Sequence, residues 1–428
     1  MISKLGLSGF KSFSQHQELK FGNFSLLLGT NASGKSNVGD ALRFLHGISR
    51  GYTLLEIMNE KRGIGGELIW KGIRGGVKDS FHRNLNNYKI SLDFNNTWNY
   101  QISVSKIFNT FIDLEILVAD GEKIYEGYYS SSENRLQETD IHGTSVTQPA
   151  HSLIQSRIFQ SNFEDHEQLP TSIRNFLLDY QLDKYKLAKE RTKQLSHTLF
   201  VINKFQKYIQ LIKFFDLNPE AMRSPSLTGQ TVLGEQGENL SSVLHAICEQ
   251  EDTKANLLEW LGALTPTDAT HFKFYTDPYT NKVLAILIES NGQETSLYSA
   301  SDGTLRFLAI LAALFSPTPA SLYFFEEIEN GIHPSRLYLL VELLEERAKS
   351  GIQIIATTHS PQLLSLVSQT TLENSSLIYR AGEPASSRIM PILEIPNIKE
   401  ILEKQDIAKL YATGWFEDVM EFMQEDSQ

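Results

Sequence analysis

The segment Gly29-Thr30-Asn31-Ala32-Ser33-Gly34-Lys35-Ser36 constrains the fold more than any other part of this chain. It has the spacing of a phosphate-binding loop: glycine, four residues, glycine, lysine and serine. The apolar run that ends at Leu28 is typical of a buried strand, and Lys35 to His46 has the periodicity of an amphipathic helix. A loop of this kind joins a strand to a helix, so the sequence predicts an α/β fold.

Each part of the loop pattern has a chemical reason. Glycines let successive backbone N–H groups converge on phosphate oxygens, and the following helix adds the positive end of its dipole. Lys35 is expected to contact the β- and γ-phosphates, and Ser36 to ligate Mg²⁺. The alternative is a glycine-rich turn that binds nothing. The residues expected to contact a nucleotide here are Gly29, Asn31, Ala32, Ser33, Gly34, Lys35, Ser36 and Asn37.

Two further apolar runs end in polar side chains. Leu322 to Phe325 leads into Glu326 and Glu327. We expect Glu326 to hold the metal ion with Ser36, and Glu327 to position or deprotonate an attacking water. The alternative for this pair is two solvated carboxylates at the exit of a strand.

The second run, Ile354 to Thr357, leads into His359. We expect His359 to reach the γ-phosphate or to orient the water. Ser360 and Pro361 also suit the start of a helix, so a capping role for this segment remains open.

A fourth segment, Ser301-Asp302-Gly303-Thr304, begins an apolar helix about 20 residues before the carboxylates. Alone, it indicates an ordinary helix start with a serine cap. Its significance comes from its place in the order of motifs along the chain.

The remaining sequence predicts three regions. Residues 1–165 form an N-terminal lobe with the loop and antiparallel strands, of which Tyr88 to Phe94 and Tyr100 to Val104 are the clearest. Residues 51–80 are expected to form a loop with little regular structure. Residues 166–265 form a helical insertion, with a basic helical stretch from Ser172 to Phe215. Residues 266–428 form a C-terminal lobe whose strands and helices alternate, which favours a parallel sheet.

The order of these motifs resembles the ABC-type ATPase heads of the SMC/RecF class, and especially the RecF-like and OLD-like AAA ATPases of bacterial genomes. The resemblance is strong over residues 1–50 and 295–370. It includes Gly9-Phe10-Lys11-Ser12-Phe13 near the start, and Glu329 to Pro334 after the carboxylates. A looser match covers residues 215–245. The implied fold is a head with a mixed parallel sheet, an antiparallel β subdomain and a helical insertion.

The resemblance also implies a mechanism. Such heads are Mg²⁺-dependent ATPases in which two copies sandwich ATP, so Ser301, Asp302 and Gly303 would act on nucleotide held by a second copy. The expected assembly is a homodimer or a higher oligomer.

This sequence departs from the family pattern in several ways. Glu326 stands where aspartate is commoner, and the signature reads Ser-Asp-Gly-Thr. The glutamine that senses Mg²⁺ cannot be placed, with Gln101 and Gln155 as candidates. OLD-type relatives carry a nuclease domain after the ATPase, whereas about 60 residues follow Pro361 here. A nuclease or toxin effector would then be a separate polypeptide.

Composition limits the partners. The net charge of −12 argues against non-specific coating of nucleic acid, although a local basic groove would still allow DNA to bind. The single Cys248 fits a reducing cytoplasm, and no membrane partner is expected. The leading hypothesis is the ATPase or sensor subunit of a bacterial defence system that works with a separate effector. The alternative is a DNA repair or recombination ATPase that binds DNA directly through lysines between 184 and 213.

Overall fold

The computed structural model describes residues 1–66, 68–83, 85–95, 97–106, 110–130, 135–139, 145–148, 200–264, 269–382 and 385–425. The chain divides into two compact units. The first contains Met1–Leu19 and Asn37–Leu211, and the second contains Lys20–Ser36 and Ile212–Gln428. Within the described ranges, no helix is both long enough and apolar enough to cross a bilayer.

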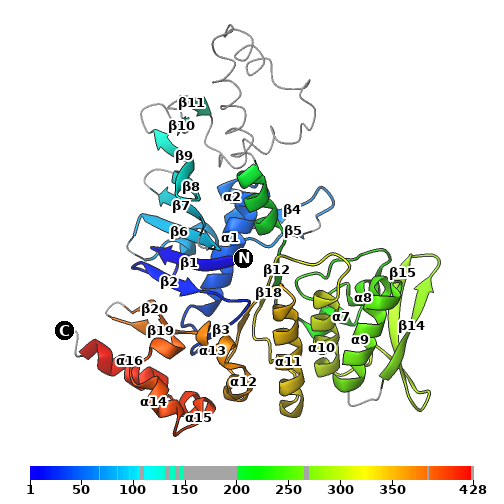
Figure 1. The fold of residues 1–428 in the computed structure, drawn as a ribbon. Helices are drawn as coiled ribbons and strands as arrows, with labels where there is room; N and C mark the ends of the chain where they lie inside the picture. Colours follow the sequence, from blue (N-terminus) through cyan, green and yellow to red (C-terminus); the bar gives the residue numbers. More distant parts are fainter. Residues whose placement is uncertain are drawn as a thin grey trace, which may run out of the picture. The chain divides into compact units, whose positions relative to one another are not determined.

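An eight-stranded sheet dominates the first unit, in the order β11-β10-β9-β8-β7-β6-β1-β2 (Figure 1). Each neighbouring pair of strands from β11 to β1 in this order is antiparallel. In β6, every second residue from Tyr88 to Phe94 is buried, which is the alternation expected of a strand with one covered face. The strands are β1 Ile2–Ser8, β2 Gln17–Lys20, β6 Asn87–Phe94, β7 Trp98–Lys106, β8 Thr110–Ala119, β9 Glu122–Ser130, β10 Arg135–Thr139 and β11 Ser145–Gln148.

Helix α1, Lys35–Ser49, begins in the second unit and continues through the first. Its C-terminal end is held by a helical stretch at 200–210. Gln206 and Gln210 both donate to the carbonyl of Ser49, and the Nδ1 of His46 is hydrogen-bonded to the carbonyl of Ile209 at 2.9 Å. These contacts fix the far end of the helix that starts at the predicted loop.

The second unit is built on a six-stranded sheet in the order β12-β17-β18-β3-β19-β20. Each neighbouring pair from β12 to β19 is parallel, and β19 and β20 are antiparallel. The carboxyl ends of parallel strands meet at one edge, where α/β proteins bind ligands. The strands are β3 Phe24–Leu28, β12 Ile212–Phe215, β17 Leu322–Phe325, β18 Gln353–Thr357, β19 Ser376–Ala381 and β20 Ser386–Pro391.

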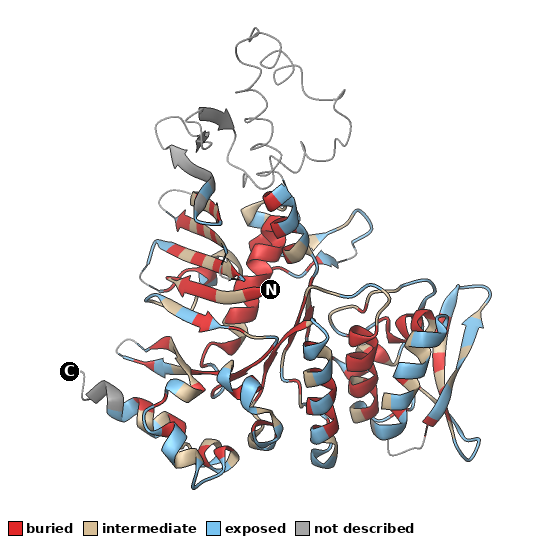
Figure 2. Cartoon of the chain, in the orientation of Figure 1, coloured by how far each residue is buried: buried red, intermediate tan, exposed pale blue. Residues whose placement is uncertain are grey.

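Helices and a smaller antiparallel sheet complete this unit. Helix α10, Asp302–Leu314, is apolar and buried on all sides from Phe307 onward, and Figure 2 shows that most of it is buried. The smaller sheet contains β13 Ser226–Leu227, β14 Ala269–Asp277, β15 Lys282–Glu289 and β16 Glu294–Ser296. The other helices are α7 Pro219–Met222, α8 Leu240–Cys248, α9 Glu251–Leu264, α11 Leu337–Lys349, α12 Pro361–Leu366, α13 Gln369–Glu373, α14 Ile398–Leu402, α15 Ile407–Ala412 and α16 Trp415–Glu425, with short 3₁₀ turns at Pro334–Arg336 and Ile392–Glu394.

The predicted fold class is confirmed: a mixed, mainly parallel sheet accompanies an antiparallel β subdomain. The predicted domain boundaries near residues 165 and 265 lie outside the described residues, as does most of the basic helical stretch. The helical interpretation is wrong for 212–215, because these residues form β12 and pair in parallel with β17. Lys213 therefore belongs to a strand of the sheet.

Residues 51–80 also contain more regular structure than predicted. They form α2 Leu54–Met58, α3 Gly76–Ser80, and the short strands β4 Lys61–Arg62 and β5 Leu68–Trp70. Thr53 and Glu56 make a reciprocal capping box at the start of α2, which satisfies backbone groups at its N-terminus.

Candidate nucleotide site

The loop after β3 adopts a backbone that few residue types tolerate. Gly29 has φ 139° and Gly34 has φ 118°. A Cβ at Gly29 would lie 2.0 Å from the carbonyl oxygen of Ile378, so no other residue fits there. Ala32 takes φ 61° although it has a side chain, which costs free energy. Backbone strain of this kind is usually found at binding sites.

Lys35 is the first residue of α1, and its side chain is buried in this loop. Its Nζ donates to the carbonyl oxygens of Gly29 at 2.6 Å and Thr30 at 2.9 Å. Burial lowers the pKa of Lys35 to about 8, while the charges of Glu327 and Glu329 act in the opposite direction. Among the described residues, no carboxylate forms an ion pair with this ammonium group, which is therefore well placed for a phosphate.

Ser36 and Glu326 come together although they are 290 positions apart in the sequence. The Ser36 hydroxyl donates to Oε2 of Glu326 at 3.2 Å. Glu326 directly follows β17, and its backbone N–H donates to the carbonyl of Phe215 on β12 at 2.9 Å. Two ligand oxygens in adjacent positions around Mg²⁺ lie about 2.9 Å apart. The hydroxyl and the carboxylate therefore suit the magnesium ion that a bound nucleotide would bring.

Glu327 has an unusual backbone, with φ 47°. Its N–H donates to Oγ1 of Thr357, the last residue of β18, at 2.8 Å. Its Oε2 accepts a short hydrogen bond from the side-chain amide of Asn330. The turn that follows β17 therefore fixes both the backbone and the carboxylate of Glu327.

His359 follows β18, and its backbone N–H donates to Oε1 of Glu329 at 2.7 Å. The other oxygen of Glu329 is buried, and no group in the described part of the chain is hydrogen-bonded to it. Burial lowers the pKa of His359, and the positive charge of Lys35 lowers it further, so the ring is neutral at neutral pH. Ser360 caps α12 by accepting from the Leu363 N–H at 3.1 Å, so the capping function exists beside whatever His359 does.

The fourth motif lies at the start of α10. Ser301 is the N-cap, and its hydroxyl accepts from the N–H of Thr304 at 3.2 Å. Asp302 forms an ion pair with Arg223. A Cβ at Gly303 would lie 2.6 Å from the carbonyl oxygen of Gly331, in the turn after the carboxylates. Ser301 therefore caps α10 as an ordinary helix start does. This capping bond is compatible with the expected contact between Ser301 and a nucleotide on a second copy of the chain.

The other predicted residues have these positions. Asn31 is exposed. Ser33 is buried, and its hydroxyl has no hydrogen-bond partner among the residues that the structure describes. Asn37 belongs to the first unit, where its amide donates to the Ser12 hydroxyl at 2.6 Å. Gln101 lies on β7, opposite Ser91 and Ile116. Gln155 lies outside the described residues.

Sequence reasoning missed several contacts to the loop from the C-terminal part of the chain. The Tyr411 hydroxyl on α15 lies 3.2 Å from the N of Gly29 and 3.3 Å from its O. The Ser387 hydroxyl donates to the carbonyl of Ser33, and Arg380 to that of Ala32 at 3.5 Å. No local pattern in the sequence signals these contacts, because they depend on how β19, β20 and α15 pack.

A family model described as "AAA domain, putative AbiEii toxin, Type IV TA system" matches residues 24–365. That range includes the loop, the signature segment, both carboxylates and His359. A curated "ATP/GTP phosphatase" of Helicobacter pylori (strain ATCC 700392 / 26695) is 26% identical over 98 residues, or 22% of this chain. The match spans 26% of that protein's length.

Solved SMC head domains match most of the length of this chain at low sequence identity. A head domain bound to the C-terminal winged-helix domain of ScpA has a TM-score of 0.46 and 16% identity, covering 91% of this chain and 97% of that one. The SMC head domain from Thermotoga maritima has a TM-score of 0.41 and 12% identity, covering 91% and 98%.

Proposed function

We propose that this chain, which belongs to the AAA-domain family of the putative AbiEii toxins, is a Mg²⁺-dependent ATPase whose working site forms between two copies. The contact between Ser36 and Glu326 carries the proposal. It joins the start of the loop helix to the end of a parallel strand, beside the buried Lys35. A hydroxyl, a carboxylate and an ammonium in this arrangement match a triphosphate with its metal ion.

Each residue would have a separate task. Lys35 would exchange its two carbonyl partners for the β- and γ-phosphates. Ser36 and Glu326 would hold Mg²⁺, which when bound neutralises charge on the phosphates. Glu327 would orient the attacking water and accept its proton, since the Asn330 amide fixes its carboxylate. His359, neutral at pH 7, would donate a hydrogen bond to the γ-phosphate.

The segment Ser301–Gly303 would complete the site from the second copy. The N-terminus of the 13-residue helix α10 presents backbone N–H groups and a positive dipole, which suit a γ-phosphate. ATP would then hold the two copies together, and hydrolysis would release them.

In the cell, we propose, this ATPase is the sensor subunit of a bacterial defence system and controls a separately encoded nuclease or toxin. The family description, which refers to toxins of toxin–antitoxin systems, supports this context. The alternative, a repair ATPase that binds DNA directly, depends on lysines of which 184 to 193 lie outside the described residues. Among the described ones, Lys204 lies 5.2 Å from the ring of Trp98 and Lys213 lies within β12.

The test uses the purified full-length chain and its Glu327→Gln variant. We expect Mg²⁺-dependent ATP hydrolysis by the wild type, and a drop of at least about 100-fold in Glu327→Gln with ATP binding retained. Size-exclusion chromatography should show an ATP-dependent dimer that accumulates in this variant. Adding Lys35→Ala to Glu327→Gln should abolish the dimer. Absence of both hydrolysis by the wild type and ATP-dependent dimers of Glu327→Gln would falsify the proposal.

A further inference from the structure

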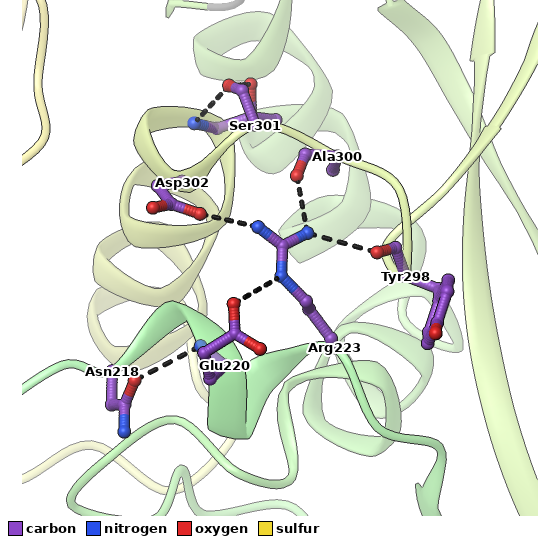
Figure 3. Close-up of polar contacts among 8 residues, drawn as sticks. Asn218, Glu220, Arg223, Tyr298, Ala300, Ser301 and Asp302 are labelled. Carbon is purple, nitrogen blue, oxygen red and sulfur yellow. Dashed lines mark hydrogen bonds and ion pairs between the residues drawn. The ribbon is translucent and has the colours of Figure 1, made fainter.

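Arg223 makes a set of contacts that the proposed function does not use. It directly follows α7, and its Nη1 donates to the carbonyl oxygens of Tyr298 at 3.0 Å and Ala300 at 2.7 Å (Figure 3). Its Nη2 pairs with the carboxylate of Asp302, and its Nε with that of Glu220 at 3.2 Å. One guanidinium thus ties down the turn that leads into Ser301.

Only an arginine can make all of these contacts. The guanidinium is planar and presents five N–H donors in a fixed fork, whereas lysine presents one compact ammonium. Here the fork reaches two backbone carbonyls and two carboxylates in different directions (Figure 3). The N–H of Leu297 donates to the carbonyl of Ala285 at 3.1 Å and that of Ser299 to Ser296 at 3.0 Å, and the bonds from Arg223 hold the remaining part of this turn, next to Ser301.

A second contact fixes the same segment from another direction. The α-carbon of Gly303 lies so close to Gly331 that a Cβ would be 2.6 Å from the carbonyl oxygen. Gly331 is itself packed against Arg306, whose Cδ lies 3.1 Å from where a Cβ at Gly331 would be. The start of α10 therefore lies between Arg223 and the turn that follows the carboxylates.

The segment that carries Arg223 also contacts the metal side of the site. The carbonyl of Phe215, at the end of β12, accepts the N–H of Glu326 at 2.9 Å. Seven residues lie between Phe215 and Arg223. The N–H groups of Asp216 and Asn218 donate to the carbonyls of Glu235 and Gln236. A short, hydrogen-bonded stretch of chain therefore links the strand end at Glu326 to the start of α10.

We propose that Arg223 is a positioning residue for Ser301–Gly303, which holds this segment in the geometry needed to bind the γ-phosphate of ATP on a second copy. The inference depends on the proposed two-copy site. Arg223 also counters the charge of Asp302, which would otherwise repel a phosphate approaching the start of α10.

Removing Arg223 should disturb this segment without unfolding the chain. Its side chain is 20% exposed, but the Asp302 and Glu220 side chains are 62% and 80% exposed. Because water can solvate both carboxylates, their loss of a partner leaves no buried charge. The main effect of Arg223→Gln should be greater freedom of the turn before Ser301.

The deciding experiment mixes two variants. Lys35→Ala has a defective loop and an intact signature segment, and Arg223→Gln has the reverse. We expect each alone to lose at least about tenfold in ATP hydrolysis. In a mixed dimer, one site combines the intact loop of Arg223→Gln with the intact segment of Lys35→Ala. Only mixed dimers contain a complete site, so a 1:1 mixture should be at least about twofold more active than the separate variants.

Controls separate the possible failures. Arg62→Gln, which removes an exposed pair with Glu60, should leave hydrolysis unchanged. Thermal denaturation should show that Arg223→Gln is folded. If Arg223→Gln is unfolded, Arg223→Lys, which keeps the charge, replaces it in the mixture and should give the same complementation. A wild type that neither hydrolyses ATP nor dimerises contradicts the proposed function. An active wild type with fully active Arg223 variants, or with mixtures no more active than the separate variants, overturns the role of Arg223.

Discussion

Gly303→Ala tests how closely the start of α10 must be positioned, and its effect can be worked from the structure. The added Cβ would lie 2.6 Å from the carbonyl oxygen of Gly331, whereas ordinary contacts of a Cβ begin at about 3.4 Å. The two backbones must therefore separate by roughly 0.8 Å, which follows from these two values. Both atoms belong to backbone, so no side chain can rotate to relieve the clash.

This displacement should affect activity far more than stability. A shift of about 1 Å in a catalytic arrangement can cost about 100-fold in rate, so we expect ATP hydrolysis to fall by about 10- to 100-fold. Overpacking costs about 1–3 kcal/mol, and replacing glycine by alanine in a helix returns up to about 1 kcal/mol. The net loss in the free energy of unfolding should then be at most about 2 kcal/mol.

Gly262→Ala is the matched control, because Gly262 lies within α9 and its added Cβ would meet nothing within 4 Å. It should stabilise the protein by up to about 1 kcal/mol and leave hydrolysis unchanged. The assays are steady-state ATP hydrolysis and urea unfolding for both variants. A Gly303→Ala variant that hydrolyses ATP within twofold of wild type would show that this spacing has no part in catalysis.

Two further predictions concern titrating groups. Since burial lowers the pKa of Lys35 to about 8 and bound phosphates favour its charged form, nucleotide binding should take up a proton and weaken about tenfold at pH 9. Calorimetric titrations without Mg²⁺ should show this pH step in wild type but not in Lys35→Arg, and a pH-independent wild type would contradict it. Burial also raises the pKa of Cys248, the single cysteine, from 9.0 to about 11. At pH 8 this thiol should therefore react with a thiol reagent about 100-fold more slowly in the native protein than in urea. Equal reaction rates in the two conditions would refute this.

The sequence was sufficient where function depends on local pattern. The runs before Gly29, Glu326 and Thr358 are mostly apolar, and each proved to be a fully buried, parallel strand of one sheet. Parallel strands deliver their following residues to a common edge, so the order of motifs alone predicted that these groups share an edge. That rule is topological and needs no knowledge of side-chain contacts.

Local pattern failed where long-range pairing decides the structure. Residues 212–215 follow a helical stretch and include Lys213, so periodicity favoured a helix, yet parallel pairing with β17 makes them a strand. Arg223, Glu329 and Tyr411 were missed as site residues for the same reason. Their partners lie far away in the chain, and nothing near them in the sequence indicates which carbonyl or amide they meet.

The backbone conformation of Glu327 is unfavourable for glutamate, and this gives evidence of function that the sequence pattern does not contain. A non-glycine residue at φ 47° costs on the order of 1–2 kcal/mol, and glycine would adopt it freely. Bonds to Thr357 and Asn330 hold Glu327 there nonetheless. A turn selected for stability alone would favour glycine at this position, so the carboxylate itself must provide what offsets the strain. This reasoning points to chemistry at Glu327 independently of its place after an apolar strand.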